Sequence, residues 1–175
     1  MSANLPGIAN TEPVAELAPL GVLAFTTTRA AGTFGTSGDD PVHAVLGRWD
    51  ALRGALDPLA RRLASASQVH GARVVVHAPG WEGWLRVAAA DGHAAREPGT
   101  ALAVTIADCV PVFIAHPSGS VALLHSGWRG TVARIVETGI ATLTGFGHAA
   151  AELHVHLGPA ICGRCYEVSP DVLAQ

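Results

Sequence analysis

Short runs of apolar residues alternate with polar, glycine-rich or proline-rich turns along most of this 175-residue chain. Several of these runs show no alternation of apolar and polar positions, which predicts strands that are buried on both faces. The predicted strands are Gly21–Thr27, Arg73–His77, Ala101–Ile106, Val110–Ala115, Ser120–His125 and Glu152–Leu157.

Two segments repeat their apolar residues at helical spacing. The first follows Asp39-Asp40-Pro41, which supplies an acidic N-cap and a proline for the first turn. The second is expected from about Gly130 to Leu143. The apolar face of the first helix is Val42, Val45, Leu46, Trp49, Leu52 and Leu56, and that of the second is Val132, Ile135, Val136, Ile140 and Leu143.

The segment Pro79–Thr100 has the glycine and proline content of a long surface loop that covers a site. We expect residues 1–18 to be a loose or edge-strand lead-in, and 19–175 have the length of one domain with a substantial core. Strands interleaved with helices predict a mixed α/β (α+β) class for this single domain.

The most informative segment is a strand-to-helix turn, His125-Ser126-Gly127-Trp128-Arg129-Gly130. Unpaired N–H groups at a helix N-terminus attract phosphate or carboxylate, and the two glycines permit a close approach of backbone and ligand. The turn therefore predicts an anion site, although a single histidine at such a junction is more often structural.

Two further segments place a potential metal ligand beside a turn, namely Gln68-Val69-His70-Gly71 and Ala107-Asp108-Cys109-Val110-Pro111. Together with the turn at His125, they offer two imidazoles and one thiolate. Three protein ligands with an open fourth position are typical of catalytic zinc, which lowers the pKa of a bound water to about 7.

The polar neighbours of these residues have both functional and structural interpretations. Arg129, with Gly127 and Gly130, is a candidate clamp for phosphate or ribose, or it pairs with Asp108 or a helix carboxylate. Asp108 orients a neighbouring group or acts as a base, or it caps turn N–H groups. Gln68 hydrogen-bonds substrate or holds the site closed, or it is a loop amide with satisfied hydrogen bonds.

Composition excludes several classes of function. All 11 basic residues are arginine, so Schiff-base, pyridoxal-phosphate and P-loop lysine chemistry is excluded. A net charge of −3 and a pI near 6.3 do not provide the basic field of a nucleic-acid binder. The most apolar stretch, Ala101–Ala115, is too short for a membrane span. Three cysteines and no visible signal peptide favour the cytoplasm.

Two smaller patterns are weaker signals. His154 and His156 alternate on one strand face, which we interpret as solvated rather than as a second metal pair. A multicopper laccase needs several His-X-His pairs and a His-Cys-His segment. This chain has one such pair and no His-Cys-His, so a copper oxidase is disfavoured. Cys162 and Cys165 form one C-x-x-C without a partner pair, which is weak evidence for zinc and leaves a redox or disulfide role as an alternative.

The segments around His70, Cys109 and His125, followed by Gly158-Pro159-Ala160-Ile161 and Cys165-Tyr166-Glu167-Val168, resemble the YfiH-type purine nucleoside phosphorylase family. This family is also called multicopper polyphenol oxidase or laccase-domain protein, and some members are named peptidoglycan editing factors. The resemblance runs from about Gly21 to the C-terminus.

The resemblance implies zinc bound by His70, Cys109 and His125. Arg29 matches an early Thr-Thr-Arg…Gly signature and is a second candidate anion contact, and Asp91 matches an aspartate that the family commonly carries. The implied reactions are phosphorolysis of adenosine, inosine, guanosine or methylthioadenosine, and deamination of adenosine to inosine. The implied partners are therefore purine nucleosides and phosphate, for a monomer or small homo-oligomer.

The implied fold is a layered arrangement of mixed sheets with flanking helices, shared with a cytotoxic-necrotizing-factor-like cysteine hydrolase domain. That kinship supplies an alternative, in which Cys109 is a nucleophile activated by histidine in a metal-free amide or ester hydrolase, including one that edits peptidoglycan precursors. A non-catalytic structural zinc is a further alternative, which the count of three ligands disfavours.

The chain departs from the family pattern in two places. Thr33–Asp39 lacks a usual Ser-Leu-Asn-Leu stretch. Family members also continue through a further helix and a strand whose arginines line the pocket, so we expect residues 19–175 to lack that C-terminal segment.

Overall fold

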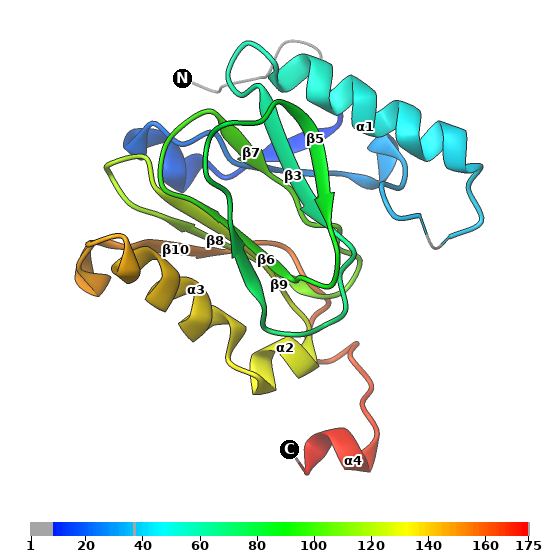
Figure 1. Ribbon diagram of the computed structural model, residues 1–175. Helices are drawn as coiled ribbons and strands as arrows, with labels where there is room; N and C mark the ends of the chain where they lie inside the picture. Colours follow the sequence, from blue (N-terminus) through cyan, green and yellow to red (C-terminus); the bar gives the residue numbers. More distant parts are fainter. Residues whose placement is uncertain (1–8, 37, 175) are drawn as a thin grey trace.

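Three sheets and their covering helices make up the computed structural model, which describes residues 9–36 and 38–174 (Figure 1). The five-stranded sheet has the order β10 (His154–Leu157), β8 (Val110–Ala115), β9 (Val121–Ser126), β6 (Gly92–Ala95) and β4 (Val74–Val76). The three-stranded sheet has the order β5 (Gly83–Val87), β3 (Arg62–Ala66) and β7 (Thr100–Leu102), and β1 (Thr11–Pro13) pairs with β2 (Phe25–Thr27).

The helices are short apart from two. These two are α1 (Val42–Leu56) and α3 (Ile135–Gly145). The others are η1 (Ala15–Leu20), η2 (Arg29–Ala31), α2 (Trp128–Val132), η3 (Ala150–Glu152) and α4 (Pro170–Leu173). Among the described residues, none of the helices has the length and apolar character that crossing a bilayer requires.

The layers follow from three apolar clusters. Helix α3 packs on one face of the five-stranded sheet through Ile135 and Leu143, and η1 packs through Leu17 against the strand residues Phe113 and Ala115. Helix α1 covers the three-stranded sheet, where Trp49 stacks on Trp84 with ring centroids 4.9 Å apart. Figure 1 shows α1 and α3 on opposite outer sides of the sheets. The predicted mixed α/β class with layered sheets is confirmed.

The start of α1 differs from the prediction. Its N-cap is Pro41, and no side chain caps it. Asp40 instead accepts a hydrogen bond of 2.7 Å from the side chain of Arg48, which lies within α1 itself. Val42 and Leu46 are also exposed rather than part of the apolar face, because only one narrow side of the helix contacts the sheet.

The second predicted helix is divided in two. Arg134 adopts a left-handed conformation with φ of 61°, between α2 and α3. Packing explains the break. The change of direction at Arg134 places Ile135 in the core, where this side chain is fully buried, and leaves Val132 exposed.

The predicted loop Pro79–Thr100 is wrong, because this segment contains β5 and β6. Strand β6 lies inside the five-stranded sheet although its sequence, Gly-His-Ala-Ala, has no strand-forming pattern. Its neighbours determine the fit: a Cβ on Gly92 would lie 2.8 Å from side-chain atoms of both Leu124 and Val74. Strand β3 was not predicted either.

Gly139 allows α3 to lie close to the five-stranded sheet. A Cβ there would be 2.7 Å from Leu124 Cδ1 and 3.0 Å from Ile114 Cδ1, whereas a Cβ on Gly145 in the same helix meets nothing within 4 Å. We expect Gly139→Ala to lower the free energy of unfolding by about 1–3 kcal/mol through overpacking. The matched Gly145→Ala should leave it unchanged or raise it by up to about 1 kcal/mol. Urea unfolding measures both, and equal stability of the two variants would contradict this packing.

Candidate metal centre

Four chain segments meet at one edge of the five-stranded sheet. Strands β8 and β6 both run antiparallel to β9, so their first residues lie beside the last residues of β9. Strand β4 is parallel to β6 and therefore starts at the same edge. Cys109 immediately precedes β8, and His125 is the second-to-last residue of β9. Asp91 immediately precedes β6, and His70 lies in the loop before β4. Strand direction therefore brings these four residues together.

His70, Cys109 and His125 form one compact donor group. Their ligand atoms lie within 4.8 Å of one another, and no other group of three His, Cys, Asp or Glu residues of this kind occurs in the described part of the chain. The two imidazole rings meet edge to face, with centroids 4.8 Å apart. His125 is buried, Cys109 is half-buried and His70 is exposed, so the group is closed on the side of the sheet and open beyond His70.

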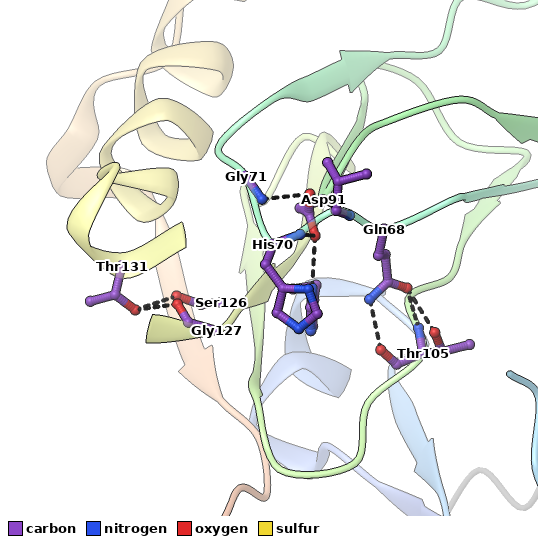
Figure 2. A network of polar contacts seen from close by, with 10 residues as sticks. Gln68, His70, Gly71, Asp91, Thr105, Ser126, Gly127 and Thr131 are labelled. Carbon is purple, nitrogen blue, oxygen red and sulfur yellow. Dashed lines mark hydrogen bonds and ion pairs between the residues drawn. The ribbon is translucent and has the colours of Figure 1, made fainter. Parts of the chain in front are cut away.

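A buried carboxylate, that of Asp91, organises this group (Figure 2). It accepts hydrogen bonds from three successive backbone N–H groups, those of Val69, His70 and Gly71, at 2.8–3.1 Å. The αL conformation of His70, with φ of 59°, lets these three groups point at one acceptor. The backbone that carries His70 is thus fixed by Asp91.

The same carboxylate orients His125. Asp91 Oδ1 lies 2.8 Å from His125 Nδ1, and the backbone N–H of His125 donates to the Asp91 carbonyl at 2.7 Å. With Nδ1 engaged, Nε2 is the nitrogen that remains for a metal, as in carboxylate–histidine–metal arrangements. Burial opposes ionisation of Asp91, but the hydrogen bonds from His125 and from the loop N–H groups outweigh it and hold the pKa of Asp91 below its ordinary value.

Gly127 leaves room for the side chains of Cys109 and His70. A Cβ on Gly127 would lie 2.9 Å from both Cys109 Sγ and His70 Cδ2. At Gly130 a Cβ would lie 3.0 Å from the Gly71 carbonyl oxygen. The sequence interpretation assigned these glycines to a close approach of ligand, whereas the structure shows them in close approach to the His70 loop and to Cys109.

The turn after His125 is held by hydroxyl groups. Thr131 Oγ1 donates to the Gly127 carbonyl at 3.0 Å and lies 3.0 Å from Ser126 Oγ (Figure 2). The helix that follows, α2, is a single turn. The turn therefore positions Gly127 and Arg129 through local hydrogen bonds rather than through the long helix expected from the sequence.

Gln68 uses its amide on the chain itself. Its Nε2 donates to the Thr105 carbonyl at 2.8 Å, and its Oε1 accepts from the backbone N–H and hydroxyl of Thr105 at 2.7 and 2.9 Å (Figure 2). These contacts tie the His70 loop to the segment that leads to Cys109. The arrangement agrees with the interpretation of Gln68 as a loop amide with satisfied hydrogen bonds.

The remaining candidate residues lie at the surface. Arg129 is exposed, with its guanidinium carbon 4.4 Å from the centre of the Trp128 ring, and no carboxylate of the described residues forms an ion pair with it. Asp108 is exposed beside Cys109, and its carbonyl accepts from Ile161 N–H at 3.0 Å. Arg29 is exposed in η2, next to the two-stranded sheet, and does not belong to the donor group.

The electrostatics of Cys109 disfavour an isolated thiolate. Burial, followed by the negative charges of Asp108 and Asp91, raises the pKa of this thiol. A cation between the three donors would reverse this preference, because a coordinating thiol is deprotonated by the metal charge.

The donor chemistry fits a transition metal. With Zn–S near 2.3 Å and Zn–N near 2.0 Å, one sulfur and two nitrogens in a tetrahedral arrangement are separated by about 3.3–3.6 Å, which small side-chain movements would reach from the observed spacing. One thiolate and two imidazoles suit zinc, and they also occur in copper sites. Three protein donors leave one coordination position for another ligand.

The other histidines do not extend this group. His154 is exposed, and His156 Nδ1 lies 3.7 Å from Glu16 Oε2. His77 Nε2 and His93 Nδ1 are 2.9 Å apart, and burial, followed by the charge of His77, lowers the pKa of His93 to about 4. His93 is therefore a neutral core residue.

Asp91 is the residue of this site whose place in the structure the residue patterns did not predict. It was placed in a surface loop, yet it is fully buried. A single carboxylate inside the small-residue segment Ala88-Ala89-Ala90-Asp91-Gly92 was the available signal, since an acidic group there is buried only if partners compensate its charge.

Comparison with known proteins gives a consistent result. Residues 26–175 match the family described as multi-copper polyphenol oxidoreductase laccase. A purine nucleoside phosphorylase of Deinococcus radiodurans is 41% identical over 127 residues, which cover 71% of this chain and 47% of that protein. A protein of an unknown prokaryotic organism, named adenosine deaminase RL5, is 37% identical over 84 residues, which cover 47% of this chain and 32% of that protein.

Among solved structures, YlmD from Geobacillus stearothermophilus is similar, with a TM-score of 0.73 and 31% identity. The similarity covers 81% of this chain and 56% of that one. The chain spans about half the length of these relatives. Because the family match extends over most of the chain and agrees with the ordered motifs, this protein belongs to the YfiH-type family of multi-copper polyphenol oxidoreductase laccase proteins.

Proposed function

We propose that this protein is a metal-dependent purine nucleoside enzyme, with zinc held by His70, Cys109 and His125. In the principal reaction, phosphate replaces the purine at C1′ of the ribose, so the N-glycosidic bond breaks and a C1′–O bond to phosphate forms. The observation that carries the proposal is the donor group with ligand atoms within 4.8 Å and one open side. The names of the relatives supply the substrate class.

A bound zinc would supply a Lewis acid that polarises an oxygen of phosphate or water at the open position. The protein residues provide position. Asp91 holds the His70 backbone and the His125 ring in place at once, so the donors are arranged before a metal or substrate arrives. The hydrogen bonds between Gln68 and Thr105 join the His70 loop to the segment that leads to Cys109, and they keep Cys109 close to that loop.

Arg129 is the residue we assign to phosphate. It is two residues after Gly127, which touches the ligand side chains, and its guanidinium has no carboxylate partner among the described residues. The stacked Trp128 limits its conformations without using its N–H donors. A guanidinium held this way can donate two parallel hydrogen bonds to a phosphate.

Deamination of adenosine is a second candidate reaction, favoured by the relative named adenosine deaminase. It requires water rather than phosphate as the second reactant, and it would use the same open position. The two reactions therefore share the metal and differ in their need for Arg129.

The first experiment is mass-spectrometric product analysis of the pure protein with adenosine and phosphate, together with metal analysis. We expect about one zinc per chain. We expect adenine plus ribose 1-phosphate, or inosine, in amounts that a chelator abolishes and added zinc restores. Products that persist after complete metal removal would contradict the metal dependence. A folded, metal-loaded protein that forms no product would contradict the assigned substrate class and direct attention to amide substrates of Cys109.

Replacing the charge of Asp91 tests the organising role of this residue. Asp91→Asn keeps the side-chain shape, but the amide cannot accept all four N–H donors as a carboxylate does. We expect zinc affinity to fall about 10- to 100-fold, with activity falling in parallel and recovering only in part at high zinc. Competition with a chromogenic chelator measures the affinity. The exposed Asp57→Asn is the matched control and should bind zinc like the parent protein, whereas equal affinities for the two variants would refute the role of Asp91.

Removing the charge of Arg129 separates the two reactions. We expect Arg129→Gln to raise KM for phosphate at least about tenfold, because the variant loses at least one hydrogen bond between charged groups. Zinc content and deamination should change little, because neither involves phosphate. Arg134→Gln, at an exposed arginine beyond α2, is the control. Phosphorolysis kinetics give the answer, and an unchanged KM for phosphate would remove Arg129 from the site.

A further inference from the structure

Two exposed thiols face one another on a turn after β10. Cys162 Sγ and Cys165 Sγ are 3.1 Å apart. The N–H of Cys165 donates to the Cys162 carbonyl at 2.9 Å, and that of Tyr166 donates to the same oxygen at 3.1 Å. These bonds define a tight turn, whose end residues have Cα atoms less than about 7 Å apart, close to the range that a disulfide spans.

The two thiols are not equivalent. Hydrogen bonds from the Cys165 thiol and from the backbone N–H groups of Arg164 and Cys165 hold the pKa of Cys162 below its ordinary value. The same contact with Cys162 raises the pKa of Cys165. Cys162 is therefore the thiol that ionises more readily and is suited to attack first, and Cys165 is suited to attack second. This is the usual division of roles in a reactive dithiol.

The pair is separate from the metal centre in its chemistry. Cys109, the third cysteine of the chain, belongs to the donor group with two histidines, whereas neither Cys162 nor Cys165 does. Backbone hydrogen bonds connect the two segments, from Ile161 N–H to the Asp108 carbonyl at 3.0 Å and from Gly158 N–H to the Pro111 carbonyl at 2.9 Å. An assay must therefore distinguish all three thiols.

We propose that Cys162 and Cys165 form a second reactive site, a dithiol that exchanges with disulfides of small thiols. The Cys162 thiolate attacks one sulfur of the small disulfide, whose S–S bond breaks and releases one thiolate. Cys165 then loses its proton to solvent and attacks Cys162 Sγ, which forms the Cys162–Cys165 bond and releases the second small thiol. The protein loses two electrons and two protons, and the disulfide is reduced to two thiols.

The chain provides a clear assay, because trypsin cuts after Arg164 between the two cysteines. The purified full chain is incubated with oxidised glutathione, quenched with acid, alkylated and digested. We expect peptides 135–164 and 165–175 to appear joined by a disulfide, with Cys109 in the separate peptide 97–129 and still alkylated. Dithiothreitol should separate the joined pair.

Single variants test the order of attack. Cys165→Ser should accumulate a glutathione adduct on Cys162, since no second thiol resolves it. Cys162→Ser should react at Cys165 more slowly, because the backbone N–H groups of Arg164 and Cys165 stabilise a thiolate at Cys162 and not at Cys165. Both residues are exposed, and near-parental thermal stability of each variant would show that folding is intact. Separate alkylated peptides from the oxidised parent protein, a disulfide to Cys109, or equal rates for the two variants would overturn the proposal.

Discussion

The structure of the site depends on one buried carboxylate, that of Asp91. An ion of this kind is costly to bury unless its oxygens are fully hydrogen-bonded, and here four N–H donors surround it. Three of these donors belong to the loop that carries His70, and the fourth belongs to the ring of His125. The hydrogen bonds that stabilise the buried charge thus also orient two of the three residues of the candidate metal centre, so the same contacts serve folding and the arrangement of the site.

The sheet supplies the third donor by topology. Because β8 starts where β9 ends, Cys109 comes beside His125 without any direct bond between their side chains. Gly127 then sets how closely the turn can approach, since any side chain there would collide with Cys109 and His70. The site therefore depends on three features from different segments of the chain. These are the buried charge of Asp91, the pairing of β8 with β9, and the absence of a side chain at Gly127.

The sequence predicted the parts of this arrangement that local patterns encode. The apolar run Val110–Ala115 is strand β8 with the expected bounds, and the three ligand-bearing segments were recognised as turns beside strands. Strand β6 was missed because Gly-His-Ala-Ala has no β propensity of its own and is a strand only through its neighbours in the sheet. Asp91 was consequently assigned to a loop, and the break at Arg134 was missed because it serves the burial of Ile135 rather than any helix-ending residue.

The gradient of exposure across the donors constrains how a substrate can approach. His125 is closed in by the sheet and by Asp91, and Cys109 is half covered, so the donor group is most open to a further ligand at His70. Arg129, which is exposed, and Trp128, which is half-buried, follow Gly127 on the adjoining turn. A ligand that carries both an anionic group and a flat ring would find complementary chemistry there, since a guanidinium binds the anion and an indole stacks on the ring. The proposed substrates, phosphate and a purine nucleoside, together carry these two kinds of group, whereas an uncharged aliphatic amide carries neither.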